Sequence, residues 1–273
     1  MIGKNNPIGV FDSGVGGLTV ASVIMREMPR ETIYYYADTG NVPYGPKSPE
    51  TIRKLVFEIL DFLVNKGVKA IVMACNTSSA LVLPLLRDQF PVPLIGVIEP
   101  GARTALSLSR NRRIGVIANE ATVRSNAYAG ILQQDDSSVV VKQKSCPLLV
   151  PLVEKGEIRS AETREVLKSY LKPLSDEGID TLIMGCTHYP FLEGPIAEIL
   201  GEGVSLVNPA ERTVAVLQES LKKTELLRVD DSPPEHRFFV SGDADEFRRI
   251  GSRLLGRAVE PAEKVTPVKN PVF

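Results

Sequence analysis

Two cysteines stand at the ends of two stretches of the chain that resemble each other. GVKAIVMACNT, from Gly67 to Thr77, and GIDTLIMGCTH, from Gly178 to His188, align at a constant offset of 111 residues and pair Cys75 with Cys186. A thiol is a base when it is ionised and an acid when it is protonated. Two thiols held on opposite faces of a tetrahedral carbon can therefore invert it, because one removes a proton and the other returns one.

The residues before each cysteine predict the elements that position it. Apolar residues at helical spacing predict a helix over 52–63 and another over 166–174. A glycine and a buried apolar stretch follow each helix, and the stretch over 70–74 predicts a strand that ends at Cys75. An internal repeat of this kind indicates two related α/β units with mostly parallel sheets. Each cysteine then lies at the carboxyl end of a strand, where such folds bind ligands.

The order of predicted elements also indicates how the chain is divided. We expect a first α/β domain from residues 1–98 plus 210–262 and a second from 99–209, with the active site in the cleft between them. The crossing is expected after a strand over 94–98, at a turn containing Pro100 and Gly101. Residues 263–273 are expected to form a C-terminal tail, and the Pro-rich residues from 260 onward to lack regular structure.

Polar residues follow other predicted strands as well. Asp12 and Ser13 come directly after a strand over 8–11, and Asp38 follows a strand over 32–37. The glycine-rich turn after Asp12 lacks the Lys-Ser/Thr of a P-loop and does not fit G-x-G-x-x-G, so the pattern disfavours a nucleotide site. A loop of turn-forming residues follows over 41–46. A further short strand is expected over 139–142.

Composition excludes several classes of protein. The 273 residues are 43% hydrophobic and 24% charged, with a net charge of −1. These values are ordinary for a globular protein and do not indicate a nucleic-acid or membrane surface. The N-terminus does not read as a signal peptide, so we expect a cytoplasmic protein. Three cysteines without a CxxC pair favour neither a disulfide framework nor a zinc site, and no metal is expected.

Four segments, taken in order, are similar to those of a known enzyme family. FDSGVGGLTV, NVPYG, ACNTSSA and GCTHYPFL resemble the signature segments of bacterial glutamate racemases, and the likeness extends over residues 7–247. The resemblance implies two α/β domains related by a pseudo-twofold axis and interconversion of L- and D-glutamate without a cofactor. It further implies a role in supplying D-glutamate for peptidoglycan, and a homodimer.

The resemblance also implies roles for individual residues. Cys75 corresponds to the base that acts on D-glutamate, and Cys186 to the base that acts on L-glutamate. Asp12, His188 and Glu154 correspond to residues that assist catalysis. The implied substrate contacts are Asp12, Ser13, Pro43, Tyr44, Gly45, Asn76, Thr77, Thr122, Thr187 and His188.

Several of these residues have more than one interpretation. Asp12 is placed to receive the substrate ammonium or to relay a proton to Cys75, and Glu154 either assists near Cys186 or is a surface residue. Asp38 either holds the loop or contacts the ligand. We interpret Cys146 as structural and His236 as a solvated surface residue.

Other functions also remain open from the sequence alone. A racemase acting on aspartate uses the same paired cysteines, and a metal-binding or redox protein would use the thiols differently. Some members of the family bind DNA gyrase, and the composition of this chain argues neither for nor against such a partner.

Overall fold

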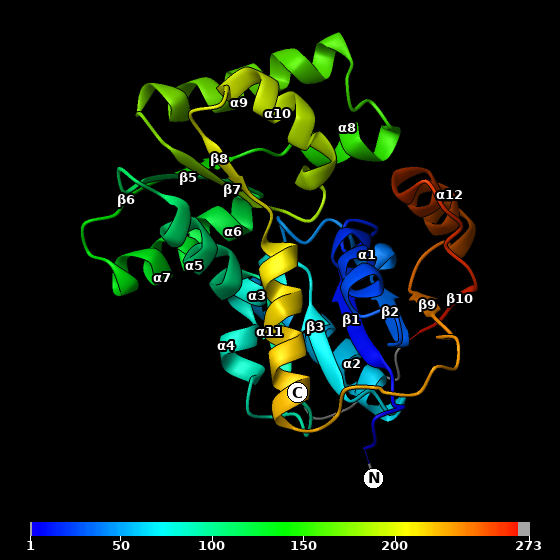
Figure 1. Cartoon of the computed structure of the whole chain (residues 1–273). Coiled ribbons are helices and arrows are strands. Elements are labelled where there is room, and N and C mark those ends of the chain that lie inside the picture. The colour runs from blue at the N-terminus through cyan, green and yellow to red at the C-terminus, as the bar shows by residue number, and fades with distance from the viewer. Residues whose placement is uncertain (1, 267–273) are drawn as a thin grey trace.

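The computed structural model describes residues 2–266, which form two parallel β-sheets with helices on both faces (Figure 1). The strands are β1 (Ile8–Asp12), β2 (Ile33–Ala37), β3 (Ala70–Met73), β4 (Leu94–Gly96), β5 (Arg113–Ala118), β6 (Val140–Ser145), β7 (Thr181–Gly185), β8 (Ser205–Val207), β9 (Arg237–Val240) and β10 (Ala262–Lys264). The α-helices are α1 (Leu18–Glu27), α2 (Pro49–Asn65), α3 (Asn76–Leu81), α4 (Leu83–Leu86), α5 (Ile98–Leu108), α6 (Glu120–Ser125), α7 (Ala127–Asp135), α8 (Leu149–Lys155), α9 (Ala161–Asp176), α10 (Glu193–Leu200), α11 (Pro209–Lys223) and α12 (Ala244–Leu255). Short 3-10 helices η1 (Thr39–Asn41) and η2 (Tyr189–Leu192) complete these elements.

The two sheets share one strand order. The six-stranded sheet runs β10-β9-β2-β1-β3-β4 and the four-stranded sheet runs β6-β5-β7-β8, and the strand pairs are parallel. The order β2-β1-β3-β4 of the first sheet is thus repeated as β6-β5-β7-β8 in the second. The predicted α/β class with two related, mostly parallel sheets is confirmed, and β3 and β7 occupy equivalent central positions.

The helices that lead into β3 and β7 begin and end in the same way. Ser48 caps α2 by accepting a hydrogen bond from the Thr51 amide at 3.2 Å, and Ser160 caps α9 by accepting one from the Thr163 amide at 3.1 Å. Past the end of each helix, Gly67 and Gly178 have φ values of +78° and +69°. Glycine adopts this left-handed conformation without steric cost, so it turns the chain from helix to strand in both units.

Four apolar clusters cover the four sheet faces. Helices α1, α11 and α12 pack on one face of the six-stranded sheet, and α2 to α4 pack on the other. Helices α8 to α10 cover one face of the four-stranded sheet, and α5 to α7 cover the other. We call the six-stranded sheet with its helices the first unit and the four-stranded sheet with its helices the second unit. The chain passes between them twice, after β4 and after β8.

The predicted turn at Pro100 and Gly101 is wrong. Both residues lie in the first turns of α5, and the strand expected over 94–98 ends at Gly96. Proline fits the first turn of a helix because its missing amide hydrogen has no partner there in any case. The strand expected over 139–142 is longer than predicted, since β6 continues to Ser145.

The expectation that residues from 260 onward lack structure is also wrong for part of that segment. Ala262–Lys264 forms β10, which pairs with β9 at the edge of the six-stranded sheet, and the Val265 amide bonds to the Val240 carbonyl at 2.8 Å. The expected C-terminal tail therefore begins inside a strand. Its residues 267–273 lie outside the described part of the chain.

A buried ion pair joins four segments at the amino-terminal edge of the six-stranded sheet. The Lys69 ammonium lies 2.6 Å from the Glu31 carboxylate, and the Lys69 side chain is 0% exposed. The ammonium also donates to the carbonyls of Lys4 and Leu226, and Glu31 accepts from the Arg228 amide. The segment that follows α11 is therefore tied to β3 through one cation.

His236 is not the fully solvated residue expected from the sequence. It is half-buried beside the same sheet edge, and its Nδ1 accepts a hydrogen bond from the Ile33 amide at 3.2 Å. Burial lowers the pKa of His236, and the positive charge of Arg257 lowers it further.

Candidate active site

The carboxyl ends of β1, β3 and β7 bring the predicted catalytic residues to the junction of the two units. Asp12 ends β1, Cys75 follows β3 and Cys186 follows β7. All three side chains are buried, with exposed fractions of 1%, 5% and 7%. Because β3 and β7 are equivalent strands, each unit contributes one thiol from the same place in its fold (Figure 1).

Cys75 is surrounded by polar groups of its own unit. Its Sγ donates a hydrogen bond to Ser13 Oγ at 3.6 Å. Burial raises the pKa of the Cys75 thiol to about 11, and the nearby Asp12 carboxylate adds to the rise, although hydrogen bonds from Ser78 and Ser13 oppose it. Cys75 is therefore a protonated thiol at neutral pH, which suits a group that first acts as an acid.

Cys186 lies beside a histidine and a glutamate. Its Sγ is 4.0 Å from His188 Nδ1, and the opposite ring nitrogen, Nε2, is 2.9 Å from Glu154 Oε1. Burial alone would lower the pKa of His188, but its hydrogen bonds to Cys186 and Glu154 and the charges of both groups raise this pKa to about 10. The imidazole is therefore a cation at neutral pH. Cys186 therefore lies beside a cationic side chain, which Cys75 does not.

Asp12 connects the two units directly. Its Oδ2 accepts from the Gly14 amide at 2.9 Å, and its Oδ1 accepts from Thr187 Oγ1 at 3.3 Å. Burial raises the pKa of Asp12, whereas the His188 charge and the hydrogen bonds from Gly14, Gly17 and Thr187 lower it. Thr19 Oγ1 of α1 also donates to the Thr187 carbonyl at 3.1 Å. The predicted contact residues Asp12 and Thr187 are therefore neighbours.

The loop after β2 is held by a buried carboxylate. Tyr44 Oη donates to Asp38 Oδ2 at 2.5 Å, while Asn41 Nδ2 and Ser241 Oγ donate to Asp38 Oδ1. Of the two interpretations of Asp38, these contacts favour the one in which it holds the loop. Within this loop Pro43 is exposed and Tyr44 is buried.

The same loop also reaches the second unit. The Gly45 carbonyl accepts a hydrogen bond from the Arg124 guanidinium of α6 at 3.3 Å. Of the predicted contact residues of this loop, Gly45 thus bonds to the second unit.

A second polar cluster joins α3 to the second unit. The Tyr128 hydroxyl donates to Asn76 Oδ1 at 2.7 Å, which leaves the amide hydrogens of Asn76 available to a ligand. Asn119 donates to Thr77 Oγ1 at 2.7 Å and accepts from Thr122 Oγ1 at 3.0 Å. The sequence analysis missed Asn119, although its position at the start of α6 directly after β5 follows the pattern of Asp12 and Asp38.

Gly16 permits the close approach of the two units, which the sequence analysis also missed. A Cβ atom added to Gly16 would lie 2.4 Å from both His188 Nδ1 and Thr187 Oγ1. The adjacent Gly17 has a similar role within its own unit, because a Cβ there would lie 2.4 Å from Asp12 Cβ. The glycine-rich turn is thus needed for packing against the candidate catalytic side chains rather than for binding a phosphate.

Gly16→Ala is expected to lower kcat/KM about 10²-fold, because the new methyl group must displace His188 or Thr187 by a substantial fraction of an ångström or more. Steady-state racemisation assays measure the effect. Gly14→Ala is the matched control, since a Cβ at Gly14 meets no atom nearer than Val42 Cγ1 at 3.9 Å. Equal activity in both variants would contradict the importance of this contact.

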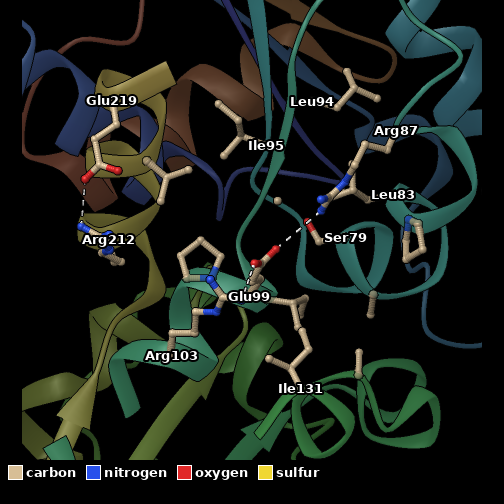
Figure 2. Close-up of a pocket in the computed structure, with 17 residues that line it drawn as sticks. Ser79, Leu83, Arg87, Leu94, Ile95, Glu99, Arg103, Ile131, Arg212 and Glu219 are labelled. Carbon is tan, nitrogen blue, oxygen red and sulfur yellow. Dashed lines mark hydrogen bonds and ion pairs between the residues drawn. The ribbon is translucent and has the colours of Figure 1, made fainter. Parts of the chain in front are cut away.

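Two cavities differ in their relation to these groups. The cavity that touches Cys186, between α1, α3, η2 and α11, has a volume of only about 10 Å³. A cavity of about 450 Å³ lies between α4, α5, α7 and α11, where Glu99 pairs with Arg87 at 3.7 Å and with Arg103 at 3.2 Å (Figure 2). Neither thiol lines this larger cavity, so its size does not make it the site of the chemistry.

All three cysteines lie within the described residues, and all three are free. Nowhere in residues 2–266 do three or more His, Cys, Asp or Glu side chains gather so as to hold a metal ion. In the same residues, no helix has the length and apolar character needed to cross a membrane. Cys146 is fully buried in the core of the second unit, where burial raises the pKa of its thiol to about 12.

Comparison with known proteins identifies the family. Residues 18–217 match the family model described as Asp/Glu/Hydantoin racemase. The chain belongs to this family. A glutamate racemase of Geobacter metallireducens is 46% identical to it over 249 residues, which are 91% of this chain and 92% of that protein. The expected resemblance to glutamate racemases is thereby confirmed over nearly the full length of this racemase chain.

Solved glutamate racemases share the whole arrangement of the two units. Isoform RacE1 from Bacillus anthracis superposes with a TM-score of 0.93 at 42% identity, over 97% of this chain and 99% of that chain. The enzyme from Francisella tularensis, crystallised in complex with D-glutamate, gives 0.91 at 37% identity, over 98% and 100%. This racemase therefore has the fold of these enzymes over nearly its whole length.

Proposed function

We propose that the protein racemises glutamate by moving protons between the substrate α-carbon and the thiols of Cys75 and Cys186. The observation that carries the proposal is the placement of these thiols after equivalent strands, β3 and β7, at the junction of the two units. Membership among the glutamate racemases supports the choice of substrate, because a relative of the same fold has been crystallised with D-glutamate.

Conversion of L-glutamate to D-glutamate begins with a proton transfer to Cys186. The Cys186 thiolate takes the α-proton and becomes a thiol, and the α-carbon gains a negative charge. The Cys75 thiol then gives its proton to the opposite face of the carbon and becomes a thiolate, which yields D-glutamate. For D-glutamate the two thiols exchange roles, and exchange with solvent resets the protonation states between turnovers of the same direction.

The α-proton is weakly acidic because the neighbouring carboxylate opposes a second negative charge. Hydrogen-bond donors fixed before the reaction stabilise such a charge without reorganising. We assign this role first to the amide hydrogens of Asn76, which its contact with Tyr128 leaves available. The hydroxyls of Thr77, Thr122 and Thr187 bond within the protein in the closed structure, and we propose that the substrate takes over some of these bonds. Ser13 and the loop residues Pro43, Tyr44 and Gly45 complete the proposed substrate contacts.

Asp12 and His188 are proposed to set the charge state of the site. The buried Asp12 carboxylate is suited to receive the substrate ammonium, whose positive charge would also favour ionisation of the neighbouring Cys75. The His188 cation, held by Glu154, places a positive charge beside Cys186. The two thiols therefore have different partners within one pseudo-symmetric frame.

Glutamate must enter by separation of the two units. The cavity at Cys186 is about 10 Å³, which is roughly the least space that holds one water molecule. The polar contacts across the junction include the hydrogen bond from Thr187 to Asp12 and the ion pair between Arg87 and Glu99. We propose that they break as the units open at the two chain crossings and form again around the substrate.

Incubation in D₂O with each enantiomer of glutamate tests the proposed function. The α-proton of either enantiomer should exchange while the circular dichroism of the pool falls to zero, because the enantiomers are equal in free energy. Aspartate in place of glutamate is the second arm. Racemisation of aspartate without racemisation of glutamate would overturn the choice of substrate.

His188 provides a pH-dependent contribution to stability. Its pKa rises from 6.5 to about 10 on folding, so the stabilisation is fully present below about pH 6.5 and is lost as pH rises towards 10. The free energy of unfolding of the wild type should therefore exceed that of His188→Asn by at least about 1.4 kcal/mol more at pH 6.5 than at pH 10. Urea unfolding of both proteins at the two pH values measures the difference. A constant difference would contradict the assignment of His188 as a cation.

Three further properties implied by the resemblance belong to this proposal. They are a homodimeric state, a cytoplasmic location and the supply of D-glutamate for peptidoglycan. Sedimentation equilibrium of the purified chain tests the first.

A further inference from the structure

Helix α12 belongs to the first unit but ends against the second. The guanidinium of Arg253 donates a hydrogen bond to the main-chain carbonyl of Glu154 in α8. The neighbouring Leu254 packs against the apolar clusters of both units. Figure 1 shows α12 and α8 facing each other across the junction. Two successive residues of α12 therefore contact the second unit.

The contact is made at the carboxyl end of a short helix. Helix α8 ends at Lys155, and Gly156 follows with a φ of +85°. The last carbonyls of a helix have no partner within it and carry partial negative charge, so a guanidinium placed there is stabilising. A Cβ added to Gly156 would lie 3.3 Å from the Arg253 Cζ, which shows how closely the guanidinium covers this helix end.

The residue held in this way is the one that orients the histidine beside Cys186. The carbonyl that Arg253 binds belongs to Glu154, whose side chain lies 2.9 Å from His188. His188 in turn lies 4.0 Å from Cys186. A continuous series of contacts thus runs from the first unit to the thiol of the second.

Cys75 has no corresponding dependence in the contacts described for it. The groups that bond to its thiol, Ser13 and Ser78, belong to its own unit. The groups bonded to the Cys75 thiol therefore come from the first unit, and the second unit reaches its surroundings through Thr187 and Asp12, which acts on the thiol by its charge and is not bonded to it. The series of direct contacts that ends at Cys186 includes a support from the other unit.

We propose that Arg253 is a positioning residue that fixes Glu154, and through it His188, when the two units are closed. Proton transfer at Cys186 then depends on closure in a way that transfer at Cys75 does not. The inference rests on the proposed assignment of Cys186 as one of the two bases.

Arg253→Met removes the hydrogen-bond donor and keeps much of the side-chain volume. We expect kcat/KM to fall about tenfold, with retention of the circular dichroism spectrum and thermal midpoint, because a misplaced catalytic group slows reaction steeply. Arg253→Lys, which keeps a cation and a donor, should recover part of the loss. Arg249→Met is the matched control on α12 and should leave activity unchanged. Within residues 2–266, Arg249 forms an ion pair with Glu246 alone, and its side chain is 63% exposed. Wild-type kinetics in Arg253→Met would overturn the proposal.

Isotope effects separate a positioning role from a general loss of structure. The equilibrium constant between enantiomers is unity, so kcat/KM must fall equally in both directions and cannot by itself show which thiol is affected. Slower transfer at Cys186 should raise the α-deuterium isotope effect for L-glutamate and lower it for D-glutamate. Equal changes for both enantiomers would contradict the proposal.

A double-mutant cycle tests whether Arg253 acts through Glu154. Arg253→Met should lower kcat/KM by a much smaller factor in a Glu154→Gln background than in the wild type, because Glu154, which Arg253 positions, is already impaired. Additive losses would overturn the proposal. Failure of the underlying function is distinguishable, since it would appear as wild-type racemisation by Cys186→Ala whatever the behaviour of the Arg253 variants.

Discussion

Cys75→Ala and Cys186→Ala are each expected to lower racemase activity by about 10²–10⁴-fold or more, in both directions. Either change removes the group that exchanges a proton on one face of the α-carbon, and inversion needs both faces. The two variants should fold normally, because alanine leaves only a small cavity at a strand end. Polarimetry with each enantiomer measures the loss, and circular dichroism measures the fold.

Cys146→Ala is the control for this experiment. Cys146 is a third buried thiol, located in the core of the second unit and bonded only weakly, to the Lys144 carbonyl at 3.5 Å. Its replacement should keep activity within about threefold of the wild type, because its thiol, although near Cys186, follows β6 and has no proposed part in proton transfer. Wild-type activity in either Cys75→Ala or Cys186→Ala would refute the two-thiol mechanism. Serine at either position should retain slight activity at most, because a hydroxyl is a far weaker base than a thiol.

Lys69→Met is expected to lower the free energy of unfolding by about 3–5 kcal/mol. The change leaves the Glu31 carboxylate buried without its cation and removes the donor to the Lys4 and Leu226 carbonyls. A typical domain is stable by only about 5–15 kcal/mol, so the loss should be visible as a large shift in the urea midpoint.

Two variants control for the loss of a charge as such. Lys168→Met removes the cation of an exposed pair with Glu165 and should cost no more than about 1 kcal/mol. Adding Glu31→Gln to Lys69→Met removes the uncompensated carboxylate and should recover part of the stability. If Lys69→Met unfolds at the same urea concentration as Lys168→Met, the buried pair does not stabilise the fold.

The parts of the site that were predicted from sequence have local signals. Cys75 and Cys186 each follow a buried strand and a helix with a glycine at its end, and this whole pattern is contained in about thirty residues of each copy. Asp12 carries the same signal of a polar residue at a strand end. The parallel α/β class follows from the same alternation of strands and helices.

The parts that were missed depend on contacts between distant segments. Gly16 matters because His188 lies against it, and Asn119 because it joins Thr77 to Thr122. No local sequence pattern indicates that these residues are in contact, because the contacts depend on how the two units pack against each other. The role of Arg253 is hidden for the same reason.

The errors at element boundaries have simpler causes. Strand β10 has the sequence AEK and pairs on one side only, so it lacks the apolar run that marks a central strand. The Pro100-Gly101 pair is typical of a turn, but proline is compatible with the first turn of a helix. The burial of one face of α5 favours the helix at these residues.

The strand order has a consequence for biosynthesis. Strands β5 to β8 are contiguous in the chain, so the second unit is complete once about residue 207 has emerged from the ribosome. The first unit begins earlier but receives α11, β9, α12 and β10 only at the end, and until then β2 is an open sheet edge. Unpaired edges are where nascent chains associate wrongly. The unit whose synthesis begins first is therefore completed last. The catalytic site can close only after the final segment, which carries Arg253, has been synthesised.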